Sequence, residues 1–213
     1  MKIIIPEKKF LSRTNDLDYF EWNYQFPIKY VQLYRFKTII KLLGDKKFER
    51  LLEIGTGSGI LLPELSKHCD YLYACDIHPN TDKIENLLFH YNVKNYEIKS
   101  QGIESTDYPD NFFDVVVGVS VLEFVDDLNA AILEIKRILK KDGFFATICP
   151  MQSDVLDFVV SLYADKPAKD EFGDARKYVY KELEKNFAIE KKGYMIPLIG
   201  KYFPVYTHYK LRK

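Results

Sequence analysis

A short glycine-rich segment follows an apolar run in the first third of the chain. Its glycines are Gly55, Gly57 and Gly59, spaced G-x-G-x-G after the letters LLEI. Glycines at a turn from strand to helix let the backbone approach a ligand with no Cβ atom in the way. A dinucleotide fingerprint, G-x-G-x-x-G, would need its third glycine at the position of Ile60. The spacing therefore argues against a turn that binds a pyrophosphate.

Two acidic residues stand at the ends of neighbouring predicted strands. Glu53 comes two residues before the first glycine, where a carboxylate repels phosphate but accepts a hydrogen bond from an amino group or pairs with its charge. Asp76 ends the next predicted strand, and a carboxylate there can accept both hydroxyls of a ribose. Together with the glycines, these acids indicate a nucleoside ligand that carries no phosphates.

The apolar patterns predict the elements that hold these residues. Between residues 48 and 150, strands are predicted at 48–54, 71–76, 96–100, 113–120 and 144–149, alternating with helices at 60–68, 80–91 and 128–139. A helix at 27–43 precedes them, and two helices at 154–163 and 174–185 and two antiparallel strands at 187–196 and 202–211 follow. Alternating strands and helices imply right-handed crossovers and a parallel sheet covered on both faces. The predicted fold is α/β, a doubly wound sheet of seven strands with the last one reversed.

The length and composition are those of one globular domain without a dedicated nucleic-acid surface. The chain has 213 residues, 47% of them hydrophobic, and its formal net charge is zero. We expect a single domain: an N-terminal helical lid at 1–45, a ligand-binding core at 46–150, and C-terminal helices with a closing hairpin at 151–213. No apolar run reaches the roughly 20 residues that span a bilayer. The apolar start is too short for a signal peptide, so a cytoplasmic location is expected.

The cysteines and histidines indicate neither a disulfide framework nor a metal site. Cys69, Cys75 and Cys149 show no C-x-x-C spacing, and the four histidines are not paired at metal-ligand spacing. Cys149 ends the fifth predicted strand, where a nucleophile is conceivable, but a buried structural thiol is the favoured interpretation. The sequence therefore predicts chemistry without a bound metal.

Taken together, these residues resemble the class I S-adenosylmethionine (SAM) dependent methyltransferases. The resemblance covers residues 48 to about 150 and includes the segment GIESTDYPDNFFDVVVGVSVLEFVDD at 102–127 and an ILKKDG turn. It is closest to the small-molecule enzymes of ubiquinone and menaquinone biosynthesis. It implies a Rossmann-like fold with a reversed last strand, SAM as the cofactor, and methyl transfer to a small-molecule acceptor.

The resemblance also implies a role for each residue of the cofactor pocket. Glu53 would bind the methionine amino group, and Asp76 would hold the ribose. The remaining contacts would be the loop of Gly55, Thr56, Gly57 and Gly59 under the methionine moiety, Ile77, the Ile103 backbone and Glu104 around adenine, and Ser120 beneath the sulfonium. One position departs from the family, which commonly has Asp where Gly102 stands, so adenine recognition would fall to Glu104 or to backbone groups.

The acceptor side of the site is less defined. Tyr19, Trp22 and Tyr24 lie in a dense aromatic stretch and are candidates to line the acceptor pocket, with core packing as the alternative. Glu123 is a candidate base if the acceptor must lose a proton, and the alternative is a solvated residue that starts a helix. The family's usual Glu-His pair is Glu123-Phe124 here, so no histidine is expected to act there.

Three other functions remain as alternatives. A non-catalytic SAM-binding protein would keep the same glycines and acids. An RNA methyltransferase would normally show Asn/Asp-Pro-Pro-Tyr/Phe after the fourth strand, and the letters VSVLEF do not match that motif. A nicotinamide oxidoreductase is disfavoured by Ile60 and Glu53. The sequence indicates neither the acceptor atom nor the oligomeric state.

Overall fold

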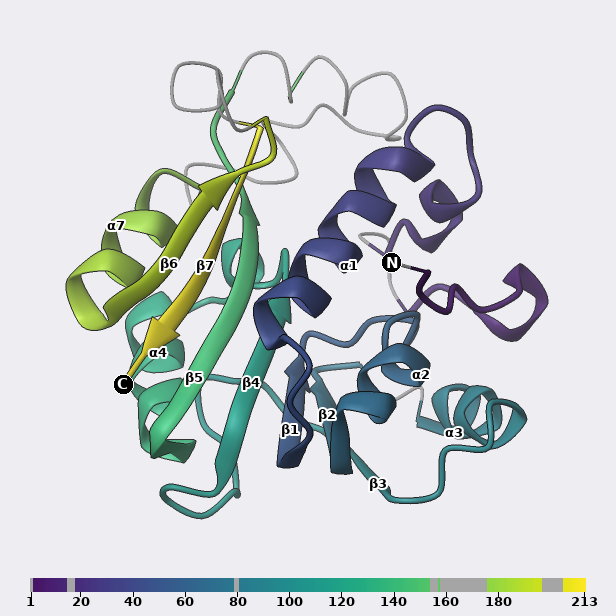
Figure 1. Ribbon diagram of the computed structural model, residues 1–213, viewed down its shortest axis with the longest axis horizontal. Coiled ribbons are helices and arrows are strands. Elements are labelled where there is room, and N and C mark those ends of the chain that lie inside the picture. The colour runs from purple at the N-terminus through teal and green to yellow at the C-terminus, as the bar shows by residue number, and fades with distance from the viewer. Residues whose placement is uncertain (1, 15–17, 79–80, 154–156, 158–175, 197–204) are drawn as a thin grey trace.

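The computed structural model describes residues 2–14, 18–78, 81–153, 157, 176–196 and 205–213, and within them seven strands form one sheet (Figure 1). The order is β3-β2-β1-β4-β5-β7-β6. The strands from β3 to β5 pair in parallel, and β7 pairs antiparallel with both β5 and β6. The bounds are β1 Phe48–Ile54, β2 Cys69–Asp76, β3 Tyr96–Ser100, β4 Phe113–Val119, β5 Leu139–Pro150, β6 Ala188–Tyr194 and β7 Tyr206–Arg212. The predicted doubly wound sheet with a reversed last strand is confirmed.

Helices cover both faces of this sheet. The α-helices are α1 Lys29–Leu43, α2 Leu62–Leu65, α3 Thr81–His90, α4 Leu128–Ile138 and α7 Arg176–Asn186, and the 3-10 helices are η1 Lys8–Phe10, η2 Phe20–Asn23, η3 Ser66–His68 and η4 Leu122–Phe124. Successive side chains of a strand point to opposite faces. On β4, Val115 and Val117 accordingly pack in the cluster that contains residues of α1, α2 and α3, whereas Val116 packs with those of α4 and α7 (Figure 1).

α1 is a layer of the core. Ile39 is fully buried, and Ile40, Leu42 and Leu43 are also buried in the cluster on the α1 face of the sheet. The helix ends where expected, at Gly44, whose φ of +73° is a conformation that glycine favours and whose N–H donates to the Ile40 carbonyl. Residues 29–43 of the predicted lid are therefore packed in the core.

Most of the predicted helices and strands are present in the structure, with ends that differ by a few residues. The predicted helix at 60–68 is divided into α2 and η3, and β5 begins at Leu139, five residues earlier than expected because the ILKKDG segment joins the strand. The predicted helix at 174–185 is α7. The predicted helix at 154–163 lies outside the described residues except for residue 157. Within the described residues, we found no helix with the length and hydrophobicity that a membrane crossing requires.

Candidate functional site

A pocket of about 1040 Å³ opens at the carboxyl ends of β1, β2 and β4. These three strands are neighbours in the sheet, and the chain leaves β1 toward one face and β4 toward the other. Ligands of open α/β sheets bind in such a crevice, where the direction of winding changes. Residues that precede or belong to α1 complete the wall of the pocket.

The glycine turn after β1 packs closely against the loop that follows the neighbouring strand β4. A Cβ atom at Gly55 would lie 2.2 Å from a methyl carbon of Val121, so the approach of the loop after β4 requires a glycine there. At Gly57 a Cβ atom would meet nothing closer than the Asp18 carboxyl, 3.6 Å away, and the residue lines the pocket. Its φ of +54° also favours glycine. Gly57 therefore leaves open the space in which a ligand can lie.

The third glycine has a different environment. Gly59 does not line the pocket, and a Cβ atom there would lie 3.1 Å from Ile84 of α3. It therefore permits the close packing of the turn on α3. Thr56, between the first two glycines, lines the pocket and donates its hydroxyl to the Glu53 carbonyl at 3.3 Å.

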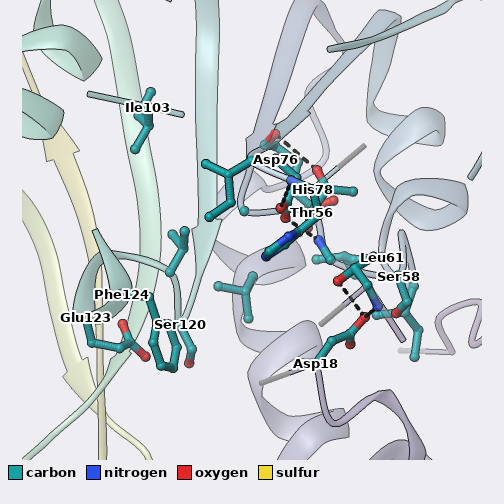
Figure 2. Close-up of a pocket in the computed structure, with 18 of the residues that line it drawn as sticks. Asp18, Thr56, Ser58, Leu61, Asp76, His78, Ile103, Ser120, Glu123 and Phe124 are labelled. Atoms are coloured by element: carbon teal, nitrogen blue, oxygen red, sulfur yellow. Dashed lines mark hydrogen bonds between the residues drawn. The ribbon is translucent and has the colours of Figure 1, made fainter. Parts of the chain in front are cut away.

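The two acids of the predicted pocket lie together at its floor. Glu53 is 4% exposed, and its Oε2 has no hydrogen-bond partner. Burial, together with the charge of Asp76, raises the pKa of Glu53 well above its ordinary value. Asp76 accepts the N–H of Gly57 at 2.8 Å on Oδ2 and the N–H of His78 at 3.0 Å on Oδ1 (Figure 2). The Asp76 carboxylate thus fixes the turn and remains able to accept further hydrogen bonds.

A third carboxylate occupies the place of the side chain that Gly102 lacks. A Cβ atom at Gly102 would lie 2.7 Å from Oε2 of Glu104. Oε1 of Glu104 accepts the N–H of Asp126 at 3.1 Å, which holds the carboxylate in this position. Ile77, 65% exposed, and the buried Ile103 line the same part of the pocket.

The segment after β4 brings two unpartnered polar side chains to the opposite wall. Ser120 has a φ of +53°, rare for a residue with a side chain, and its buried Oγ has no hydrogen-bond partner. Glu123, in η4, is 4% exposed, and neither of its carboxylate oxygens has a partner. Burial outweighs the attraction of Arg35 and Arg176 and raises the pKa of Glu123 to about 7. Glu123 lies in the first turn of η4, as the alternative expects, but its burial contradicts a solvated position.

The buried carboxyl of Glu123 predicts a contribution to stability that decreases as pH rises. The folded pKa of Glu123 lies above its ordinary value of 4.5, so the folded protein holds this proton more strongly than the unfolded chain. The resulting stability is present below about pH 4.5 and is lost as pH rises through about 7, by on the order of 3 kcal/mol for a shift of this size. Chemical denaturation of the ligand-free protein at pH 5.5 and 8 measures it. Glu123→Gln should flatten this dependence, and an unchanged slope would contradict the assignment.

The aromatic stretch contributes two of its three predicted residues to the pocket. Tyr19 and Trp22 line it, with stacked rings whose centroids lie 4.4 Å apart. Tyr24 does not line it: its hydroxyl donates to the Pro6 carbonyl, and its side chain packs against the buried cluster of Leu11, Phe20 and Leu87, the last of which belongs to α3. The prediction for Tyr24 is therefore corrected, because its side chain joins the N-terminal segment to α3.

The structure adds residues to the site that the sequence did not predict. Asp18 lies beside Gly57 and accepts the N–H and the hydroxyl of Thr14, both at 3.1 Å (Figure 2). Burial raises the pKa of Asp18. Arg35 of α1 also lines the pocket and donates to Oε1 of Gln32. In the sequence, Arg35 could have been recognised as a pocket residue from its position one helical turn after Gln32, since the two form a polar pair on a helix rich in apolar residues.

The thiols and potential metal ligands do not form a reactive centre in the part of the chain that the structure describes. Cys69, Cys75 and Cys149 are free and buried. Burial raises the pKa of the Cys149 thiol, so it remains protonated at neutral pH and is a poor nucleophile. Among the described residues, no three or more His, Cys, Asp or Glu side chains are grouped to hold a metal ion.

Comparison with known proteins gives matches to methyltransferases. Residues 52–147 match the family described as methyltransferase domain. A protein from Schizosaccharomyces pombe, uncharacterized methyltransferase C1B3.06c, is 27% identical over 124 residues, which cover 54% of this chain and 44% of that protein. The chain spans about half the length of the curated relatives it matches.

Solved structures share the fold over most of the chain. A SAM dependent methyltransferase from Aquifex aeolicus has a TM-score of 0.64 and 19% identity, covering 86% of this chain and 92% of that one. The N-methyltransferase NodS from Bradyrhizobium japonicum WM9, in complex with S-adenosyl-L-homocysteine, has a TM-score of 0.62 and 17% identity, covering 85% of this chain and 87% of that one. At sequence identities this low, the structural similarity establishes a shared fold and nothing further.

Proposed function

We propose that this chain, whose residues 52–147 match a methyltransferase domain, is a class I SAM-dependent methyltransferase that transfers a methyl group from SAM to a small-molecule acceptor. The observation that carries the proposal is the position of Glu53, Gly57 and Asp76, which meet at one end of the pocket. SAM supplies a methyl group already activated by a cationic sulfur. The protein therefore needs to exclude water and hold a nucleophile in line with that carbon, roughly 3 Å away.

The methionine and ribose portions of SAM fit the floor of the pocket. The unpartnered Oε2 of Glu53 is a buried acceptor that an amino group would satisfy. The carboxylate of Asp76 retains lone pairs for the ribose hydroxyls while it holds the turn through Gly57. Gly55, Thr56 and Gly57 would then pass beneath the methionine moiety, and Gly59 would support them from behind.

The adenine portion fits the wall formed by Ile77, Ile103 and Glu104. The two isoleucines offer an apolar surface for the ring, and the carboxylate of Glu104 can accept the amino group of adenine. Since Glu104 fills the space above Gly102, it would take the role of the Asp that is common at that position in the family. Ser120, whose hydroxyl is unpartnered, would lie beneath the sulfonium at the boundary with the acceptor.

We expect Glu104→Ala to weaken the binding of SAM and S-adenosylhomocysteine by roughly tenfold to a hundredfold, because a hydrogen bond to a charged acceptor contributes about 1.5–3 kcal/mol. Titration calorimetry measures this loss. Asp107→Ala is the matched control, since this nearby exposed carboxylate is paired with Lys99 and does not line the pocket. Equal affinities for both variants would contradict the role of Glu104.

The charge of the pocket supports a small molecule over a nucleic acid. Among the described residues that line it, the carboxylates are opposed by few cationic side chains, chiefly Arg35, and would repel a phosphate backbone. The zwitterionic methionine end and the sulfonium give SAM a net positive charge, which these carboxylates attract. The acidic lining residues are Asp18, Glu53, Asp76, Glu104, Glu123, Asp126 and Asp127.

Thermal unfolding with candidate cofactors, followed by detection of product, tests the proposed function. SAM at a hundredfold its dissociation constant should add ~2.7 kcal/mol to stability, and NAD should add none. Incubation with a small-molecule panel should then release S-adenosylhomocysteine. Stabilisation by NAD alone would instead favour an oxidoreductase, and SAM binding without turnover of any acceptor would favour a non-catalytic SAM-binding protein.

The described residues before α1 are proposed to act as the lid of this pocket. Hydrogen bonds join them to the helices, from the Ile4 N–H to Glu64 at 2.7 Å and from the Glu7 N–H to the Tyr91 hydroxyl at 3.2 Å. Because lids belong to the less stable parts of a structure, we expect protease cleavage within residues 2–28 before cleavage of α1, and slower cleavage when S-adenosylhomocysteine is bound. Mass spectrometry of the fragments measures both effects. Cleavage unaffected by the ligand would contradict a lid.

A further inference from the structure

We propose that the methyl acceptor is an amine, which binds to Glu123 and gives its proton to that carboxylate. The inference rests on the proposed function, because it names the class of acceptor for the same pocket. Glu123 is 4% exposed, lines the pocket, and has no hydrogen-bond partner on either carboxylate oxygen. Figure 2 shows Glu123 and Ser120 on one side of the pocket and Asp18 on the other. The proposed contacts with SAM use Glu53, Asp76 and Glu104 and leave Glu123 for the acceptor.

The neighbours of Glu123 do not satisfy its carboxylate. Arg35 of α1 donates to Gln32, and Arg176 of α7 forms an ion pair with Asp157 at 2.8 Å. Both guanidinium groups act on Glu123 through their charge, yet neither donates a hydrogen bond to it. A buried carboxylate without a partner is unfavourable, so a ligand that brings a charged donor to it gains more affinity than a neutral ligand.

Among the described residues in this part of the pocket, Glu123 is the group whose charge changes near neutral pH. The other titratable groups that face it are Cys149 of β5 and Tyr206 of β7, besides the two arginines. Burial raises the pKa of both Cys149 and Tyr206, which therefore stay neutral, and arginine stays charged. The pKa of Glu123 is about 7, so its negative charge is present above that pH.

The lining of the pocket selects an amine over other acceptors. An acceptor that carries a carboxylate or phosphate would be repelled by the acidic side chains already named. An alcohol would hydrogen-bond to Glu123 but bring no opposite charge. An ammonium group gains both, because it donates hydrogen bonds to the carboxylate and carries the opposite charge.

The proposed step is balanced with the groups present in the pocket. The bound ammonium gives one proton to the Glu123 carboxylate and becomes a neutral amine with a free lone pair. That lone pair forms the new N–C bond with the methyl group of SAM as the C–S bond breaks, and the bonding electrons remain on sulfur. The products are S-adenosylhomocysteine and a methylated ammonium, and Glu123 releases its proton to water.

Binding of matched amines and alcohols to the complex with S-adenosylhomocysteine tests the inference. The probes are 2-phenylethylamine with 2-phenylethanol and butylamine with butanol, titrated at pH 8 and pH 6. At pH 8 at least one amine should bind roughly tenfold to a hundredfold more tightly than its alcohol. At pH 6 Glu123 is protonated, so this preference should fall, although both amines remain charged. Glu123→Gln should show little preference at either pH.

Asp107→Asn is the matched control, because it removes one exposed carboxylate that does not line the pocket and should keep the preference. No amine preference in either pair, or an equal preference in Glu123→Gln, overturns the inference. Binding of S-adenosylhomocysteine is measured first in every variant. Its failure in the unaltered protein would overturn the proposed function, whereas cofactor binding without an amine preference would overturn only the choice of acceptor.

Discussion

Gly57→Val is expected to abolish the binding of SAM and S-adenosylhomocysteine. A Cβ atom at this position meets no atom of the protein closer than 3.6 Å, so the branched side chain would extend into the pocket where the methionine moiety is proposed to lie. Valine at a φ of +54° is also strained, at a cost of about 1–3 kcal/mol. Titration calorimetry with S-adenosylhomocysteine measures the affinity, and circular dichroism checks the fold.

Gly44→Val is the control that separates the effect of backbone strain from the effect of a side chain that fills the pocket. Gly44 has a φ of +73° and no atom within 4 Å of the position that a Cβ atom would take, but it lies at the end of α1 and outside the pocket. Gly44 also has a ψ of −160°, a combination that side chains other than glycine rarely adopt, so Gly44→Val should lose at least as much stability, and only Gly57→Val should lose the ligand. If Gly57→Val retained its affinity, the glycine turn would have a purely structural role.

Ile39→Ala is expected to lower the free energy of unfolding by about 2–5 kcal/mol, the usual effect of removing a large buried aliphatic side chain. Ile39 is fully buried and packs in the cluster that includes Val117 of β4 and Ala146 of β5. The substitution leaves a cavity between α1 and the sheet, and the loss should be present with and without ligand. Urea denaturation followed by circular dichroism measures it.

Lys41→Ala on the same helix is the control for this substitution. Lys41 is exposed, and alanine favours a helix, so its effect should stay within about 0.5 kcal/mol. If Ile39→Ala had an equally small effect on stability but prevented methyl transfer, α1 would be a movable part of the lid. The packing of α1 in the core predicts the opposite result.

Much of the sheet could be predicted because its central strands β1, β4 and β5 contain continuous buried runs. Segments such as FDVVVGV of β4 are nearly all apolar, and each is separated from the next by a helical pattern or a turn. The carboxyl ends of parallel strands share one edge, so Glu53 and Asp76 could be expected near the same ligand before any contact was known. The boundary of β5 was less predictable because polar residues begin the strand.

The acceptor side could not be predicted in the same way. Asp18 and Arg35 reach the pocket through the packing of the N-terminal segment and α1, and no spacing along the chain shows which strand ends they will meet. For the same reason Tyr24 and Gly59, although close in sequence to pocket residues, have their contacts with α3. Residue type and spacing do not show the direction in which an irregular segment turns.

The sequence by itself determined the order of strands and helices along the chain, the glycine turn and the acids at the carboxyl ends of β1 and β2. These features depend on local periodicity and on chain direction, both of which can be read along the chain. Only the tertiary structure decided that Glu104 covers Gly102 and that Glu123 is buried without a partner. Burial and pairing are set by side chains from distant segments, here α1, β5, β7 and α7, so the charge state of Glu123 is a property of the assembled fold.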